Sequence, residues 1–100
     1  MFRFIETRPV GGDCICGYRL ELDKEYTVAS FIETVLKERS NEWGYIGIDK
    51  KGAWRGEPNC EYRRGKLMTK QLDEEYLNKK ILEVRADGGW SRMDYIITCY

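Results

Sequence analysis

This chain of 100 residues contains no histidine. Histidine is the commonest general base and metal ligand, and it activates many serine and cysteine nucleophiles. Its absence therefore weakens most enzyme hypotheses. The chain also has no net charge, because its 17 basic residues balance 17 acidic ones. No global field attracts nucleic acid or a membrane, so any electrostatic recognition must be local.

Long apolar runs are absent as well. No uninterrupted apolar stretch exceeds three residues, and Glu6 and Arg8 interrupt the region where a signal peptide has its apolar centre. We therefore expect a cytoplasmic chain that does not enter a membrane.

Cysteine is scarce and irregularly spaced, at positions 14, 16, 60 and 99. Structural zinc sites usually separate paired cysteines by two to four residues, whereas Cys14 and Cys16 are separated by one and the other two are isolated. The functional alternative is a zinc site or a redox-active pair of cysteines. We predict free thiols, with Cys14 and Cys16 on one face of a strand as small core residues, and we expect no cofactor or metal.

The residues that are present predict one folded domain spanning 1–100. An apolar fraction of 42% with 34% charged residues is typical of globular chains and not of disordered ones. A domain of this length buries about two-thirds of the surface that its unfolded chain exposes, so folding needs no disulfide or metal.

Residues 26–39 give the clearest secondary-structure pattern. Apolar side chains recur there at three- and four-residue steps, which indicates one buried face of a helix: Val28, Phe31, Ile32, Val35 and Leu36. Thr27 is the expected N-cap, and Tyr26 and Phe31 occupy the two positions of a hydrophobic staple.

Alternating residues predict a β-hairpin at each end of the chain. In the first, residues 2–22, a loop at residues 11–13 sets Phe4 opposite Leu20 and Arg3 opposite Glu21. In the second, strands at 81–86 and 92–99 flank a turn at Asp87-Gly88. This turn sets Glu83 opposite Arg92, whereas a turn one residue later would oppose like charges.

The middle of the chain has a weaker pattern. It predicts a strand at 43–48 running back beside the first hairpin, short strands at 53–55, 60–64 and 67–70, and a helical turn at 74–77. We therefore expect an α+β domain: a β-hairpin, one main helix packed on an antiparallel or mixed sheet, and a C-terminal β-hairpin. The order hairpin, helix, strand is similar to a β-grasp layout, and this similarity carries no function.

A local excess of positive charge supplies the candidate site. Residues 50–70 contain seven basic and two acidic side chains, a local net charge of +5 in a neutral chain. Aromatic residues lie among these cations, a combination used for single-stranded nucleic acid and enriched at protein interfaces. The candidate binding residues are Trp54, Arg55, Tyr62, Arg63, Arg64 and Lys66. The alternative is an ordinary solvated surface with its aromatic residues in the core.

No catalytic residues are predicted. The acidic cluster Asp73-Glu74-Glu75 fits the first turn of a short helix, where negative charge is favourable. We expect a small non-catalytic binding protein, of the adaptor or inhibitor type, that docks on a macromolecular partner through residues 50–70. Neutral net charge favours a protein partner over nucleic acid. The alternatives are a single-stranded nucleic-acid-binding protein, and a small enzyme or metal protein based on carboxylates or thiols.

Overall fold

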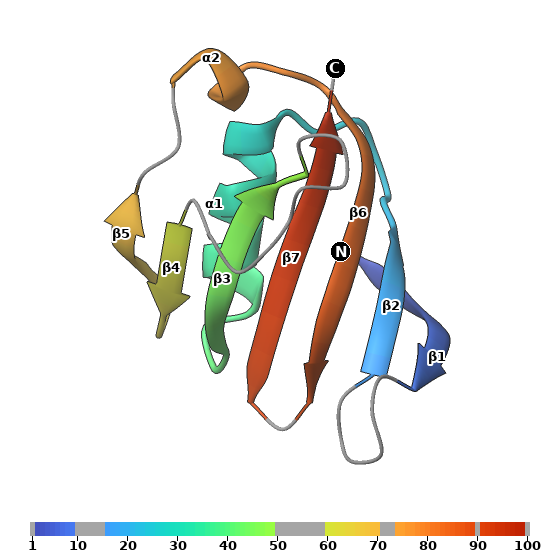
Figure 1. The fold of residues 1–100 in the computed structure, drawn as a ribbon. Helices are drawn as coiled ribbons and strands as arrows, with labels where there is room; N and C mark the ends of the chain where they lie inside the picture. Colours follow the sequence, from blue (N-terminus) through green and yellow to red (C-terminus); the bar gives the residue numbers. More distant parts are fainter. Residues whose placement is uncertain (1, 10–15, 50–59, 71–73, 90, 100) are drawn as a thin grey trace.

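The computed structural model describes residues 2–9, 16–49, 60–70, 74–89 and 91–99. Within these residues the chain is a small single domain with a seven-stranded mixed sheet and two helices (Figure 1). The elements in chain order are β1 (Arg3–Pro9), β2 (Cys16–Glu21), α1 (Val28–Glu38), β3 (Trp43–Ile48), β4 (Cys60–Arg63), β5 (Lys66–Lys70), α2 (Glu74–Leu77), β6 (Ile81–Gly89) and β7 (Arg92–Cys99).

The strand order in the sheet is β1-β2-β6-β7-β3-β4-β5. β3 and β7 are parallel, and the other neighbouring strands are antiparallel. The prediction that residues 43–48 run beside the first hairpin is wrong, because both C-terminal strands lie between that hairpin and β3. Parallel pairing joins segments that are distant in sequence, so no local pattern indicated it.

Helix α1 begins as the sequence predicted. Ser30 donates its backbone N–H to the Thr27 hydroxyl (3.2 Å), and Thr27 donates its own to the Ser30 hydroxyl (2.9 Å). The staple is also present, because the rings of Tyr26 and Phe31 meet edge to face at 6.2 Å. Neither helix of the described chain has the length and apolar composition that a membrane crossing requires.

The apolar face of α1 lies in the main core. Val28, Phe31 and Val35 are fully buried, and Figure 1 shows the helix behind the sheet. The Phe31 ring contacts Tyr95 of β7, with 5.7 Å between centroids, and Phe2 before β1, with 4.8 Å. These contacts leave the other face of the sheet to the charged side chains described below.

The register of the N-terminal hairpin agrees with its sequence. Phe4 pairs with Leu20 and Arg3 with Glu21, and the last two side chains form an ion pair at 3.6 Å. A register irregularity follows between Glu6 and Arg8. The predicted loop at residues 11–13, with the first cysteine, lies outside the described residues, and so does the short strand at 53–55.

The C-terminal hairpin has a different register from the predicted one. β6 and β7 remain paired as far as Gly89 and Arg92, so the strands continue past the expected turn at Asp87-Gly88. The pairing of Glu83 with Arg92 is wrong, because Glu83 lies opposite Thr98. The observed register does place like charges opposite each other, at Asp87 and Asp94.

Packing explains this register better than turn preference does. It pairs Val84 with Ile97 and Ala86 with Tyr95, and all four side chains are fully buried. Gly88 does not form a turn but lets the two strands approach closely. A Cβ at this position would lie 2.3 Å from the Arg92 carbonyl oxygen. Burial of two apolar pairs outweighs the local preference of Asp-Gly for a turn.

Candidate functional site

The β4–β5 hairpin contains four of the six predicted binding residues, and three of these four are exposed. Arg63, Arg64 and Lys66 are all exposed at its turn. Trp54 and Arg55 lie outside the described residues, so their predicted role is untested. The surface can therefore be built only from the hairpin and its neighbours in the sheet.

Tyr62 is not at this surface. Its side chain is fully buried, its hydroxyl donates to the Met93 carbonyl oxygen at 2.7 Å, and its ring lies 6.1 Å from that of Tyr95. Burial also raises the pKa of Tyr62 well above its ordinary value. The strand alternation of β4 turns residue 62 inward and residue 63 outward, so this ring offers no stacking face to a partner.

The turn between β4 and β5 holds Arg64 in an uncommon conformation. Arg64 has φ 52° and Gly65 has φ 76°, so both central residues are left-handed, as in the turns that match strand twist. Glycine adopts this conformation without cost, whereas arginine adopts it only at an energetic cost. The turn thus projects a cation from a position where asparagine or glycine is the usual choice.

Cross-strand pairing places two further residues beside this hairpin. Lys66 lies opposite Arg63, Arg63 opposite Trp43 in β3, and Trp43 opposite Arg92 in β7. Residues paired in this way share a face of the sheet. We name Lys66, Arg63, Trp43 and Arg92 the basic row; it brings three cations to a half-buried indole.

The centre of the basic row is a compact cluster of charge and aromatic surface. The Arg92 guanidinium lies 4.9 Å from the Trp43 ring centre and 5.2 Å from that of Tyr45. It also forms an ion pair with Asp94 at 3.1 Å. Asp94 accepts the Tyr45 backbone N–H at 3.0 Å, and these contacts offset its like-charge pairing with Asp87.

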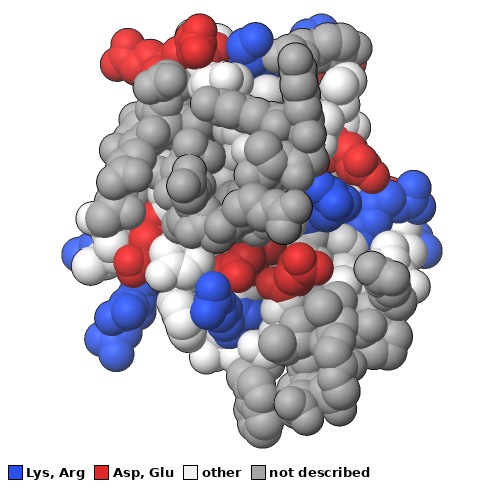
Figure 2. All heavy atoms as spheres, in the orientation of Figure 1, with Lys and Arg blue, Asp and Glu red and all other residues white. Residues whose placement is uncertain are grey.

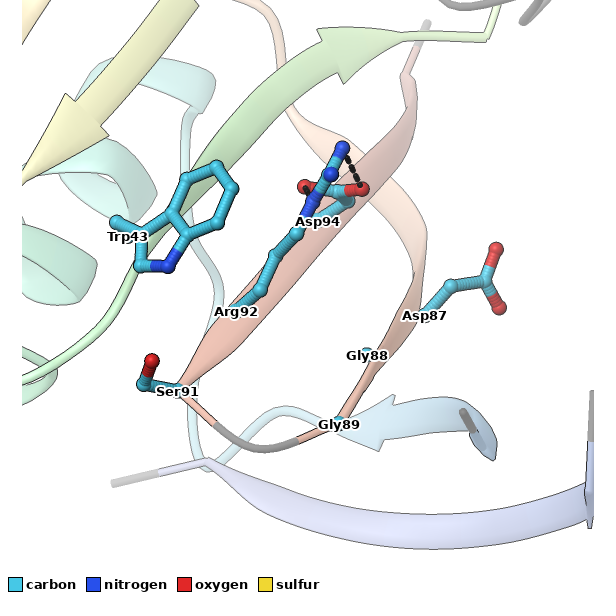
Figure 3. Close-up of a pocket in the computed structure, with 7 residues that line it drawn as sticks. All are labelled: Trp43, Asp87, Gly88, Gly89, Ser91, Arg92 and Asp94. Atoms are coloured by element: carbon cyan, nitrogen blue, oxygen red, sulfur yellow. Dashed lines mark hydrogen bonds and ion pairs between the residues drawn. The ribbon is translucent and has the colours of Figure 1, made fainter. Parts of the chain in front are cut away.

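A hollow of about 520 Å³ opens beside this cluster. Figure 3 shows the Trp43 indole beside the Arg92 side chain, with the Asp94 carboxylate facing the guanidinium. On β6 the backbone of Gly88 and Gly89 lines this hollow. Its described lining is Trp43, Asp87, Gly88, Gly89, Ser91, Arg92 and Asp94.

A second row of side chains follows the first on the same face. Glu61 of β4 lies opposite Tyr45, Tyr45 contacts Asp94 of β7, and Asp94 lies opposite Asp87 of β6. We name these four residues the acidic row. Figure 2 shows this face of the molecule, with acidic side chains bordered by basic ones.

An ion pair on the opposite side holds the start of β3 in place. Arg39, at the end of α1, pairs with Glu42, and Tyr95 donates its hydroxyl to Glu42 Oε1 at 3.2 Å. The Arg39 guanidinium also covers the Phe4 ring, 4.8 Å from its centre. Because Glu42 precedes Trp43 directly, this network fixes the strand end that presents the indole.

The described thiols and carboxylates form no competing centre. Cys60 is fully buried, and burial raises the pKa of the Cys99 thiol, which disfavours the reactive thiolate. Glu74 and Glu75 are exposed in the short helix α2, and Asp73 lies outside the described residues. Within the described part of the chain, no three potential ligands gather as a metal site.

No family model, curated protein sequence or solved structure matches this chain in comparisons with known proteins.

Sequence reasoning found the basic half of this surface and missed Trp43 and Arg92. Both residues lay outside the segment of local charge excess, and only the parallel pairing of β3 with β7 joins them. A weak signal was present: Trp43 and Tyr45 alternate, as do Arg92 and Asp94, which predicts two polar or aromatic side chains on one face of each strand.

Proposed function

We propose that this protein is a small non-catalytic binding protein, of the adaptor or inhibitor type, that docks on an acidic surface of a protein partner. The docking surface is the basic row together with Arg64. The observation that carries the proposal is the row itself, which sets Arg63 and Lys66 beside Trp43 and Arg92. Tryptophan, tyrosine and arginine are the residue types that dominate binding energy at protein interfaces.

The surface supports docking better than catalysis. It offers several exposed cations and a half-buried aromatic ring, which suit a wide contact, and no described nucleophile with an adjacent base. An enzyme or metal protein based on carboxylates or thiols remains the less supported alternative. The expected cytoplasmic location rests on the sequence alone and stays a prediction.

The β-grasp-like layout is a proposal about architecture only. The order of hairpin, helix and strand along the chain supports it. The two C-terminal strands that separate the first hairpin from β3 weaken it.

The test is a comparison of retained proteins between matched variants. The tagged chain, its Arg63→Glu, Arg64→Glu variant and a control with Lys37→Glu and Lys80→Glu are incubated with nuclease-treated extract of the source cells. Both variants change the net charge equally, and all four side chains are exposed. We expect a partner that the wild type and the control retain and the first variant loses, confirmed by titration of the two purified proteins.

Retention of every partner by the Arg63→Glu, Arg64→Glu variant would refute the proposal, as would equal losses from both variants. The salt dependence of the purified pair adds a second check, because charge reversal in a contact of this kind acts mainly through the association rate.

Single-stranded nucleic acid is the second candidate partner, and the Trp43 ring beside Arg92 is the observation that favours it. Titration with a fluorescent oligonucleotide at near-physiological salt distinguishes the two. Nucleic acid binding would fall steeply with salt, and each lost phosphate contact would lower the slope by a little under one. Competition between the oligonucleotide and the protein partner would show that they share the basic row.

A further inference from the structure

The basic row ends at an edge of the sheet. Its members are cross-strand neighbours, so the row runs across β7, β3, β4 and β5, and Lys66 is its last residue. β5 is a terminal strand in the sheet order, and Figure 1 shows no described element beyond it. The outer side of an edge strand presents backbone N–H and C=O groups to which another strand can bind.

Two cations at this edge repel each other. Arg63 and Lys66 lie directly opposite, and like charges in such a pair are unfavourable. Neither side chain forms an ion pair with another described residue. A further strand beside β5 would place one of its own side chains next to Lys66, as the next member of the row. An acidic residue at that position would offset the repulsion.

The composition of β5 favours the same kind of strand. It contains two lysines and no acidic residue, so it repels a second copy of itself and attracts an acidic segment. Met68 of this strand is 56% exposed, and its flexible thioether side chain can adapt to an apolar side chain of a partner. The edge therefore suits an acidic segment that also carries an apolar residue.

The other edge of the sheet suits strand addition less well. β1 includes Pro9, which lacks the N–H that strand pairing requires. The cation at its start, Arg3, already forms an ion pair with Glu21 at 3.6 Å. Of the two edges, β5 is thus the one that combines uncompensated cations with an exposed apolar side chain.

We propose that the protein partner adds an extended acidic strand to the outer edge of β5, with a carboxylate beside Lys66. The added strand forms main-chain hydrogen bonds with β5, and an apolar side chain of the same segment contacts Met68. In this mode of recognition the main chain provides affinity and the side chains provide specificity. The inference rests on the proposed function, and it specifies how the partner binds at the end of the basic row.

Peptide selection followed by N-methylation tests the inference without a known partner. The immobilised chain is used to select from a random dodecapeptide phage library. The most enriched peptide is then synthesised in a series in which each backbone N–H in turn is replaced by N-methyl. In an added strand every second N–H faces the neighbouring strand and the others face away. The positions that face away are matched controls for the positions that pair.

We expect the selected peptides to be acidic. N-methylation should weaken binding about tenfold at alternate positions and change it little at the positions between them, because only alternate N–H groups donate to β5. Lys66→Glu should also weaken binding, and it should not impair folding, since it sets opposite charges across β4 and β5. Lys37→Glu, at an exposed position of α1, changes the net charge equally and should leave binding unchanged.

Effects of N-methylation without alternation would overturn the inference. Enriched peptides that are not acidic, no enrichment, or equal binding to the wild type and to Lys66→Glu would also overturn it. A failure of the proposed function gives a different result. If the Arg63→Glu, Arg64→Glu variant loses its natural partner while the peptides show no alternation, docking through the basic row stands and only strand addition is wrong.

Discussion

At residue 64, backbone conformation and side-chain role impose opposite requirements. A left-handed residue other than glycine costs roughly 1–2 kcal/mol, and asparagine lowers this cost through local hydrogen bonds. Arginine does not lower the cost in this way, yet Arg64 occupies the position with φ 52°. Strain of this kind is often retained at functional positions, which is consistent with a docking role for the cation.

The first prediction separates these two requirements. Arg64→Asn should raise the unfolding free energy by up to about 1 kcal/mol, which is a few degrees in melting temperature for a domain of this size. The same change should weaken binding of the protein partner, because a cation is lost. Thermal melts and a binding titration measure the two effects.

Gly65→Ala is the control at the neighbouring position. It should destabilise, since Gly65 has φ 76° and a Cβ there would lie 3.1 Å from the Leu36 carbonyl oxygen. A stabilised Gly65→Ala variant would show that the turn conformation is assigned wrongly.

The second prediction tests the burial of Tyr62. Tyr62→Phe removes its hydrogen bond to the Met93 carbonyl and should cost about 0.5–1.5 kcal/mol, the usual net value of such a bond. Binding should not change, because the ring does not reach the surface. Urea denaturation gives the stability, and titration with the purified partner gives the affinity.

Trp43→Ala is the counterpart at the surface. It should weaken binding about tenfold or more while the fold persists, as interface anchors do. If Tyr62→Phe lost binding without a change in fold, Tyr62 would belong to the docking surface.

At the scale of elements, α1 contributes mainly through its buried face. The third prediction is that Phe31→Ala costs about 3–5 kcal/mol, because the ring leaves a cavity among Phe2, Tyr26 and Tyr95. Glu33→Ala, on the exposed side of the same helix, should change stability by less than about half a kcal/mol. Equal melting temperatures for these variants would contradict the assignment of the buried face.

Local signals predicted the elements that depend on neighbours in sequence. The cap at Thr27 joins side chains a few residues apart, and the pairing of Phe4 with Leu20 joins two strands that are close in sequence. The register of β6 and β7 was missed because Gly88 indicates a turn in sequence, whereas in the sheet it permits contact with the Arg92 carbonyl. The local preference of a residue for a turn carries no information about how that residue packs in the sheet.

The candidate site also contains residues that a local pattern predicts and residues that only the sheet order brings together. Arg63, Arg64 and Lys66 were predicted because they lie within one charged segment. Tyr62 was assigned to the surface because composition, unlike strand alternation, does not distinguish inner from outer positions. Tyr45 and Asp94 lie 49 positions apart in sequence and meet only through the parallel pair. Contacts of that separation require the sheet order, which the sequence pattern did not contain.

At the scale of the whole molecule, the core contains several tyrosines whose hydroxyl groups stay protonated in the folded state. Tyr26 lies just before α1, Tyr62 lies in β4 and Tyr95 lies in β7, and all three are buried. Burial is the largest cause of the raised pKa of each phenol, and it raises the pKa of Tyr26 to about 12. In the unfolded chain the same groups ionise near their ordinary pKa of about 10.

The fourth prediction is that stability falls steadily above pH 10 or so. Between about 10 and about 12 the unfolded chain has released the Tyr26 proton and the folded chain retains it, so rising pH favours unfolding. Tyr62 and Tyr95 extend the loss to higher pH. Below the unfolded pKa both states hold these protons, and the phenols contribute no pH dependence. Urea denaturation from neutral pH to about pH 12 should show this decline, with tyrosinate absorbance rising as the fold is lost.

Tyr26→Phe supplies the control for this pH dependence. It removes one titrating phenol and its 2.6 Å hydrogen bond to Asp23, so the variant should be less stable at neutral pH and lose stability less steeply in alkali. An unfolding free energy that stays constant across the alkaline range would mean that these hydroxyls ionise as readily in the folded protein as in the unfolded chain. Tyrosinate absorbance that rises fully before the fold is lost would have the same meaning.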